Sequence, residues 1–231
     1  MHVPNPLIAG AKEFELPAGT TVYNMSAPTA LADPVKAIAE ALDHPIASKP
    51  LRQIAKEKLV GKADATAVIV ISDNTRPVPY KGEGNILVPI IEILLEVGYK
   101  KENILVLIAT GTHRPMTADE IERIIDPWVF EQGVKVVNHD CLDYDALTYL
   151  GKTERGSEVR ISSLYVNADM KILTGLVESH FMAGVSGGRK SICPGLISEM
   201  GTFLFHGADL MGHPNSRDLN LEGNPVHEES T

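Results

Sequence analysis

Two short apolar runs in this chain stop abruptly at polar loops, and an amphipathic segment follows each loop. Residues 66–71 (TAVIVI) are continuous, apolar and largely β-branched, and they end at Ser72-Asp73-Asn74-Thr75-Arg76-Pro77. Residues 104–108 end in the same way near Gly111-Thr112-His113-Arg114-Pro115. Runs of this kind are typical of parallel strands that are buried on both faces. The sequence therefore predicts an α/β fold with a mostly parallel sheet flanked by helices.

Further elements fit the same architecture. Asp33-Pro34 predicts a helix start, and Thr117 to Glu120 has the pattern of a capping box. Additional helices are expected over residues 50–58, 85–97 and 196–205, and strands over 134–137, 159–163 and 170–174. The first twenty-five residues are expected to form a strand or an arm. Beyond His206 the chain is polar and shows no apolar periodicity.

Composition narrows the functional classes. The 231 residues are 44% hydrophobic and 22% charged, as in a packed globular protein, and the net charge of -9 argues against nucleic acid as a partner. Two cysteines are too few for a disulfide framework and suggest a reducing compartment. The most apolar stretch, residues 86–97, is too short and too charged to span a membrane, and no signal peptide is recognised. A soluble cytoplasmic protein without membrane partners is expected.

The polar loops concentrate chemistry on one rim of the predicted sheet, because ligands of open α/β sheets bind beyond the carboxyl ends of the strands. We expect this rim to hold Asp73, Arg76, His113, Arg114 and the loop of residues 180–190. Each arginine precedes a proline that stiffens its loop, which suits bidentate capture of a carboxylate or phosphate. A salt bridge to one of the thirty acidic residues is the alternative for each.

The glycine-rich segment Ser186-Gly187-Gly188-Arg189-Lys190-Ser191 is the most unusual loop. Its glycines allow close approach of the backbone to a ligand, and successive amides can bind an anion. A P-loop requires glycine immediately before the lysine, and Arg189 stands there instead. A simple glycine turn with solvated basic residues remains the alternative.

Histidines supply the candidate acids, bases and metal ligands. His113 and His180 stand out, because each lies at a strand end beside arginine or glycine-rich sequence. His206 alone carries no such signal, and His139 is left open. The remaining four are interpreted as surface residues: His2, His44, His213 and His227. Cys141 is interpreted as a buried thiol and Cys193 as a loop residue of low reactivity.

Taken together, the segments 72–77, 111–115 and 178–195 resemble the nickel-pincer lactate racemase family. The resemblance runs from about Ala41 to the end of the chain, and the third motif (ESHFMAGVSGGRKSICPG) is its most specific part. It implies an isomerase that racemises or epimerises an α-hydroxy acid through reversible hydride transfer. The cofactor it implies is a nickel-bearing pyridinium-3,5-bisthiocarboxylic acid mononucleotide, made by dedicated biosynthetic enzymes.

The resemblance also implies a role for each matching residue. Lys190 would attach the cofactor covalently, and His206 would complete the coordination of nickel. His113 and His180 would be the paired acid and base, and Arg76 would hold the substrate carboxylate. The ribose and phosphate would be bound by the remaining cofactor-binding residues: Asp73, Thr75, Ser186, Gly187 and Gly188.

Members of that family have a second α/β domain that closes over the site. Residues 1–231 are therefore expected to be an N-terminal cofactor-binding catalytic domain that lacks the second domain, and to be inactive in isolation. Lactate, malate, a longer hydroxy acid and a sugar acid all stay open as substrates. The alternatives in other functional classes are a non-catalytic cofactor-binding module and a degenerate P-loop NTPase.

Overall fold

The computed structural model describes residues 2–3, 14–23 and 29–231. The chain divides into two compact units, Met1–Ala32 and Asp33–Thr231. In the first unit, β1 (His2–Val3) pairs antiparallel with β2 (Phe14–Glu15). The strand or arm expected in residues 1–25 lies in large part outside the described residues. All further elements belong to the second unit.

A four-stranded parallel sheet forms the centre of the second unit, as predicted. Its strands are β3 (Ala67–Ser72), β4 (Ile104–Ala109), β5 (Lys135–Asn138) and β8 (Met170–Leu173). They are arranged in the order β5-β4-β3-β8, and all pair in parallel. Four of the six residues of β4 and five of those of β3 are buried, which explains their uninterrupted apolar sequences.

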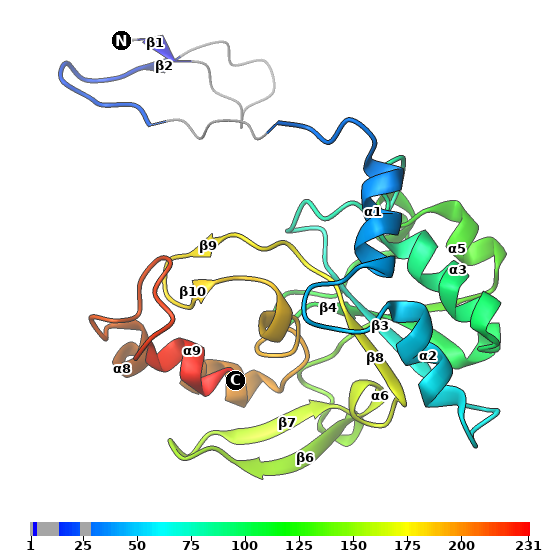
Figure 1. Ribbon diagram of the computed structural model, residues 1–231. Coiled ribbons are helices and arrows are strands. Elements are labelled where there is room, and N and C mark those ends of the chain that lie inside the picture. Colours follow the sequence, from blue (N-terminus) through cyan, green and yellow to red (C-terminus); the bar gives the residue numbers. More distant parts are fainter. Residues whose placement is uncertain (1, 4–13, 24–28) are drawn as a thin grey trace. The chain divides into compact units, whose positions relative to one another are not determined.

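Helices cover one face of the sheet (Figure 1). This layer contains α1 (Pro34–Asp43), α2 (Leu51–Leu59), α3 (Leu87–Val97), α4 (Ala118–Ile124) and α5 (Pro127–Glu131). The larger core cluster joins Ile69 and Ile71 of β3 to Leu87, Ile91 and Leu94 of α3. The predicted caps are confirmed: Asp33 caps α1, and Thr117 and Glu120 form a capping box on α4. Gly98 ends α3.

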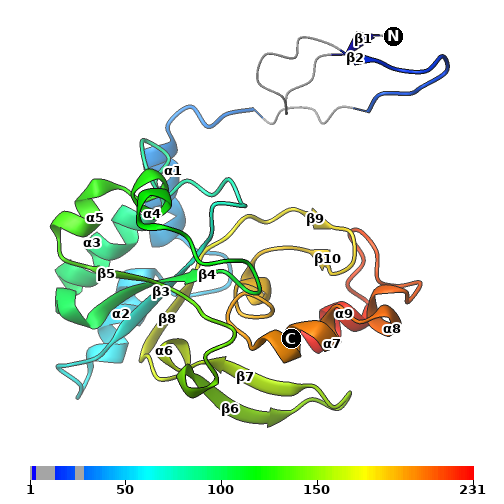
Figure 2. The ribbon, with the colours of Figure 1, turned by 180° about the vertical axis from the view of Figure 1, so that it is seen from behind.

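A β-hairpin and a loop cover the other face (Figure 2). Its strands, β6 (Leu147–Lys152) and β7 (Glu158–Ser162), pair antiparallel, and α6 (Ser163–Val166) follows. Val68, Val70 and Leu107 of the sheet pack here with Leu196 and Ala168. The predicted strand at 159–163 therefore exists, but it pairs with β6, which the sequence analysis missed. Single turns, η1 (Lys101–Asn103) and η2 (Tyr144–Ala146), precede β4 and β6.

The C-terminal part is built from short elements around the third motif. They are β9 (Ser179–His180), β10 (Gly184–Val185), η3 (Gly188–Ser191), α7 (Glu199–Phe205), α8 (Ala208–Met211) and α9 (Pro225–Glu229). The helix expected at 196–205 begins later, because Ser198 caps it. Beyond His206, where the sequence has no apolar periodicity, the structure forms the short helices α8 and α9, which bury Leu210 and Val226. In the part of the chain that the structure describes, no helix has both the length and the apolarity to cross a membrane.

Candidate active site

A cavity of about 450 Å³ lies beyond the carboxyl ends of β3 and β4, where the sequence placed the rim. Its walls come from the loops after both strands, from the segment 175–195 and from His206. The structure thus brings together nine of the ten predicted site residues: Asp73, Thr75, Arg76, His113, His180, Ser186, Gly187, Lys190 and His206. The tenth, Gly188, is exposed and is not among the residues that line this cavity.

His113 is fixed by a buried carboxylate. Its Nδ1 lies 2.6 Å from Oδ2 of Asp73, whose side chain is 5% exposed. The other oxygen of Asp73 accepts hydrogen bonds from the hydroxyl of Thr75 at 2.5 Å and from its backbone N–H at 3.1 Å. An ionised carboxylate only accepts hydrogen bonds, so the proton of the His113–Asp73 contact lies on Nδ1. Nε2 of neutral His113 therefore carries a lone pair, as a proton acceptor requires.

Asp73 was predicted to bind the cofactor, and the structure shows its two oxygens bound within the protein. Thr75 is likewise bound to Asp73 through its hydroxyl. Both line the cavity, and their role toward a cofactor stays a prediction.

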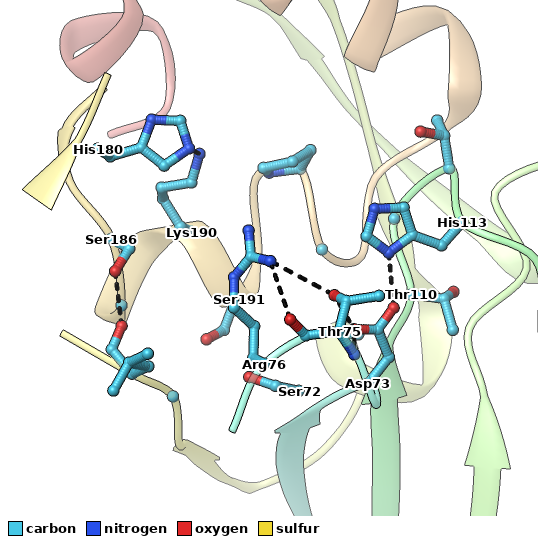
Figure 3. Close-up of a pocket in the computed structure, with 18 of the residues that line it drawn as sticks. Ser72, Asp73, Thr75, Arg76, Thr110, His113, His180, Ser186, Lys190 and Ser191 are labelled. Atoms are coloured by element: carbon cyan, nitrogen blue, oxygen red, sulfur yellow. Dashed lines mark hydrogen bonds and ion pairs between the residues drawn. The ribbon is translucent and has the colours of Figure 1, made fainter. Parts of the chain in front are cut away.

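Arg76 lies between the His113–Asp73 pair and the His180–Lys190 pair (Figure 3). Its Nη1 donates to the carbonyl oxygen of Thr75 at 3.3 Å, and its Nε is 4.0 Å from a carboxylate oxygen of Glu178. These contacts are long, and the side chain is 43% exposed. The guanidinium is held loosely at the cavity, in a position to bind an anionic group of a ligand.

The expectation that Arg114 shares this rim is wrong in detail. Its guanidinium makes two hydrogen bonds to Glu120, at 2.8 and 2.6 Å, and does not line the cavity. Glu120 belongs to the capping box of α4, and Arg114 lowers the pKa of its carboxyl to about 2. The salt-bridge alternative therefore holds for Arg114.

His180 and Lys190 form the second pair of the cavity. Nε2 of His180 is 3.1 Å from Nζ of Lys190. Burial, with Lys190 and Arg76 nearby, lowers the pKa of His180 to about 4. Burial also lowers the pKa of Lys190 to about 8. His180 is therefore neutral near pH 7, whereas Lys190 is still mostly protonated there and becomes neutral as the pH rises through about 8.

His206 follows α7 directly and lines the cavity beside these groups. Burial lowers its pKa, and the charge of Lys190 adds to this effect. Phe205 is buried, with its ring 5.6 Å from Nζ of Lys190. A neutral imidazole is the form that ligates a metal.

The glycine-rich loop does not form a P-loop. Lys190 and Ser191 lie in the short turn η3, whereas a phosphate cradle is followed by an α-helix. Ser186 donates to the carbonyl of Leu176 at 2.7 Å and accepts the N–H of Glu178 at 3.0 Å, so its hydroxyl joins the segment after β10 to the segment before β9. A Cβ on Gly187 would come within 2.9 Å of Val177, so this glycine is required for packing.

Sequence reasoning missed a buried network beneath the cavity. The hydroxyl of Tyr80 accepts the backbone N–H of Ser72 at 2.8 Å and bonds the hydroxyl of Thr174 at 2.9 Å. Ser191 then donates to the carbonyl of Thr174 at 2.9 Å. The network ties the loop of Arg76 to the turn of Lys190. The only sequence signal was a tyrosine shortly after two prolines, which is not specific.

Of the histidines and cysteines that do not line the cavity, some lie in the interior of the fold and others on its surface. His139 is 3% exposed and its Nε2 donates to the carbonyl of Ile197 at 3.0 Å, so it packs inside the fold. Cys141 is buried, as expected, and burial raises the pKa of Cys193 to about 12. His44 and His213 are exposed.

The side chains of the cavity fit the implied nickel cofactor. Within residues 2–3, 14–23 and 29–231, no three His, Cys, Asp or Glu side chains are grouped as a metal site. His206 would therefore contribute a single ligand, which fits a metal that arrives with its other donors already attached. Lys190, with its lowered pKa, fits covalent attachment at the same cavity.

Comparisons with known proteins identify the family of this chain. The family described as the lactate racemase N-terminal domain matches residues 9–218. The chain is 35% identical over 210 residues to lactate racemase from Thermoanaerobacterium thermosaccharolyticum, and 33% over 198 residues to lactate racemase from Lactiplantibacillus plantarum. These alignments cover 91% and 83% of this chain but only 45% and 43% of the relatives. The chain thus spans less than half the length of these relatives.

Solved structures give the same result. The lactate racemase apoprotein from T. thermosaccharolyticum superposes with a TM-score of 0.77 at 30% identity, covering 96% of this chain and 50% of that one. A protein from Thermotoga maritima superposes with a TM-score of 0.58 at 24% identity, covering 78% of this chain and 45% of that one, and it supports the fold alone. The confirmed fold and the long family match establish that this chain belongs to the lactate racemase N-terminal domain family.

Proposed function

We propose that this chain carries the acid–base and cofactor-attachment residues of an α-hydroxy-acid racemase or epimerase that uses a nickel-pincer nucleotide. The observation that carries the proposal is one cavity in which His113 and His180 lie on opposite sides, with Arg76 between them (Figure 3). Lys190 and His206 line the same cavity. The names of the relatives support lactate, or a related small hydroxy acid, as the substrate class.

Inversion of a hydroxy-acid carbon requires proton transfer to and from the hydroxyl group on both sides of the substrate. His113 suits one side, because the contact with Asp73 orients the ring and leaves Nε2 to accept a proton. His180 suits the other side, and its Nε2 is bound to Lys190 in the described state. Its part in proton transfer therefore begins once that contact is released. Arg76 would hold the substrate carboxylate between the two rings.

The cofactor, when bound, supplies an electrophilic acceptor for hydride, which no amino-acid side chain provides. In this proposal Lys190 holds it covalently and His206 binds its nickel ion. Asp73, Thr75, Ser186, Gly187 and Gly188 are the predicted contacts for its ribose and phosphate. Enzymes that make the cofactor are the implied protein partners. A cytoplasmic location stays a prediction that rests on composition.

Residues 1–231 are proposed to form the cofactor-binding half of the catalytic unit. Phe181 and Met211 line the cavity and are 64% and 37% exposed, so its wall is partly apolar and open. A hydroxy acid that has lost hydride from its carbon and the proton from its hydroxyl group is a keto acid, which an open site would release. A covering domain is therefore expected to be needed for turnover.

The test is to express the chain together with the cofactor-making enzymes, and in parallel as a chimera joined to the remaining half of the T. thermosaccharolyticum lactate racemase. Nickel content and intact mass report loading, and chiral chromatography reports racemisation of lactate, malate, longer hydroxy acids and sugar acids. We expect both proteins to load and the chimera to racemise at least one acid. Loading without racemisation by either protein would favour a cofactor-binding module. Absence of loading would overturn the proposal.

A further inference from the structure

The contact between His180 and Lys190 leaves open which atom carries the shared proton. Nδ1 of His180 decides the question, because it lies 3.4 Å from the backbone N of Met182 and 3.3 Å from that of Ala183, and accepts both N–H groups. A backbone N–H only donates. Nδ1 therefore presents a lone pair, and the single proton of the neutral ring lies on Nε2.

This tautomer favours the neutral form of the lysine. Nε2–H of His180 points its donor at Nζ of Lys190, 3.1 Å away, and an amine accepts a hydrogen bond only when it is neutral. An ammonium group would place its N–H donors against another N–H. The imidazolium form is disfavoured for the same reason, since Nδ1 would then face two backbone donors.

The surroundings of Lys190 favour the same assignment. The side chain is half-buried beside the ring of Phe205. Burial is the main cause that lowers its pKa, and the positive charges of Arg189 and Arg76 add to this effect. A thiolate at Cys193 would raise the pKa of Lys190. Burial raises the pKa of the Cys193 thiol to about 12, so the thiol stays protonated and does not have this effect. His206 also faces this group and is itself held neutral by burial.

The geometry points to a second task for His180: it is a positioning residue whose Nε2–H binds and so favours the neutral, nucleophilic form of the Lys190 amine before any cofactor is bound. The amine is thereby ready to attack an acyl or thioacyl carbon of an anionic ligand that Arg76 can attract. The inference deepens the proposed function and rests on it only for the identity of the natural ligand. Once Lys190 has become an amide or thioamide, its nitrogen no longer accepts a hydrogen bond, and Nε2 of His180 is released.

The test uses the chain without cofactor and a small acyl reagent, p-nitrophenyl acetate. The Lys190 nitrogen attacks the acyl carbon, a C–N bond forms, the C–O bond breaks, p-nitrophenolate leaves, and the amine proton passes to water. Acetylation is read by peptide mass spectrometry between pH 6 and pH 9.5. The exposed Lys56, read in the same digest, corrects for reagent decay. Lys190→Arg identifies the labelled site.

The matched variant is His180→Phe, which keeps a ring beside Phe181 and keeps Lys190 covered but removes the donor. We expect acetylation of Lys190 at pH 7 to be slower by about threefold or more, because each pKa unit changes the neutral fraction roughly tenfold below the pKa. If burial alone set the state of Lys190, acetylation in His180→Phe would be unchanged or faster. That result would overturn the inference.

A second measurement does not depend on the variant folding. Long-range ¹H–¹⁵N spectra of the unmodified chain report which ring nitrogen of His180 is protonated, and Nε2–H is expected near pH 7.5. Protonation of Nδ1 would overturn the inference. Neither readout involves turnover, so absence of racemisation would contradict the proposed function and leave the state of Lys190 to be decided by these results.

Discussion

Oδ2 of the buried Asp73 lies 2.6 Å from Nδ1 of His113, while Oδ1 accepts two hydrogen bonds from Thr75. Thr75 thus holds the carboxylate through one oxygen, and the other oxygen orients the imidazole of the neighbouring loop. The arrangement joins the ends of β3 and β4, and it sets a proton of His113 on Nδ1, the nitrogen that faces Asp73.

Asp73→Asn tests this arrangement. An amide has one oxygen and one NH₂ group. Its NH₂ group must therefore face either Thr75 or His113, where the carboxylate offers an acceptor. We expect the free energy of unfolding to fall by about 1–2 kcal/mol, as for other buried hydrogen bonds that lose an acceptor. Urea unfolding measures the loss, and ¹⁵N shifts of His113 report its tautomer. Thr75→Ser, which keeps the hydroxyl, is the control. Wild-type stability and an unchanged His113 tautomer in Asp73→Asn would contradict the role of Asp73.

The two arginines that share an x-Arg-Pro context give a matched pair. Arg76→Gln is expected to weaken lactate binding by roughly 10- to 100-fold, because a charge-assisted contact contributes about 1.5–3 kcal/mol. Arg114→Gln is expected to leave binding unchanged, because Arg114 is bound to Glu120 away from the cavity. Titration of lactate, followed by amide shifts of residues 72–77, measures both. Equal losses in the two variants would remove Arg76 from substrate binding.

The sheet could be predicted because β3 and β4 are buried on both faces, so their apolar runs are uninterrupted. The strand β6 was missed for the opposite reason: of its six residues only Leu147 is buried, and the pattern of a buried strand is absent. Helix α9 was missed because its five residues are too few to show a helical period in the sequence. It is stabilised by the N-cap Asn224 and by the buried Val226.

The site was predictable to the level of its loops, since polar segments after parallel strands meet at one edge. Which side chains contact one another within the site was not predictable. Arg76 and Arg114 both stand directly before a proline, and what separates them is the contact of Arg114 with Glu120 of the capping box. The His180–Lys190 contact depends on a turn in which two backbone N–H groups fix the ring, and residue spacing does not specify that geometry.

The C-terminal helix provides a further test of stability. Glu229 is 5% exposed and accepts hydrogen bonds from the hydroxyls of Thr153 and Ser157 in the β6–β7 hairpin. Its removal in Glu229→Ala leaves buried donors unpaired, and we expect a loss of about 2–3 kcal/mol in the free energy of unfolding. The adjacent Glu228 is 49% exposed and pairs with Arg155. Glu228→Ala is expected to lose less than about 1 kcal/mol. Similar losses in chemical denaturation would show that burial of Glu229 is unimportant.

Acid should destabilise the fold in part through His139. Burial lowers its pKa below the ordinary 6.5, so the unfolded chain binds this proton at a higher pH than the folded chain. Its contribution is fully present above about pH 6.5 and is lost as the pH falls toward the lowered folded value. His139→Gln keeps an N–H donor for the carbonyl of Ile197 and removes the titration. We expect its stability to fall less between pH 7.5 and pH 5 than that of the unmodified chain. An identical fall in urea unfolding at the two pH values would exclude His139 as a contributor.

Gly195 closes the turn that carries Lys190 against the end of β4. Its carbonyl accepts the N–H of Gly111 at 3.0 Å. A Cβ at this position would lie 2.3 Å from the carbonyl oxygen of Ser191 and 2.9 Å from Cβ of Ala109. Neither a backbone oxygen nor a strand residue can move aside cheaply, so Gly195→Ala must displace the turn. We expect a loss of about 2–4 kcal/mol in the free energy of unfolding, within the range of severe overpacking.

Gly84→Ala is the control for Gly195→Ala, because its nearest neighbour, Cβ of Pro79, would be at an ordinary 3.9 Å. Its expected change is within about 0.5 kcal/mol. Both variants are compared by urea unfolding and by acetylation of Lys190, since a displaced turn separates Nζ from Nε2 of His180. Slower acetylation is expected only in Gly195→Ala. If the two variants matched each other in both measurements, the close packing of this turn against β4 would not be what positions Lys190.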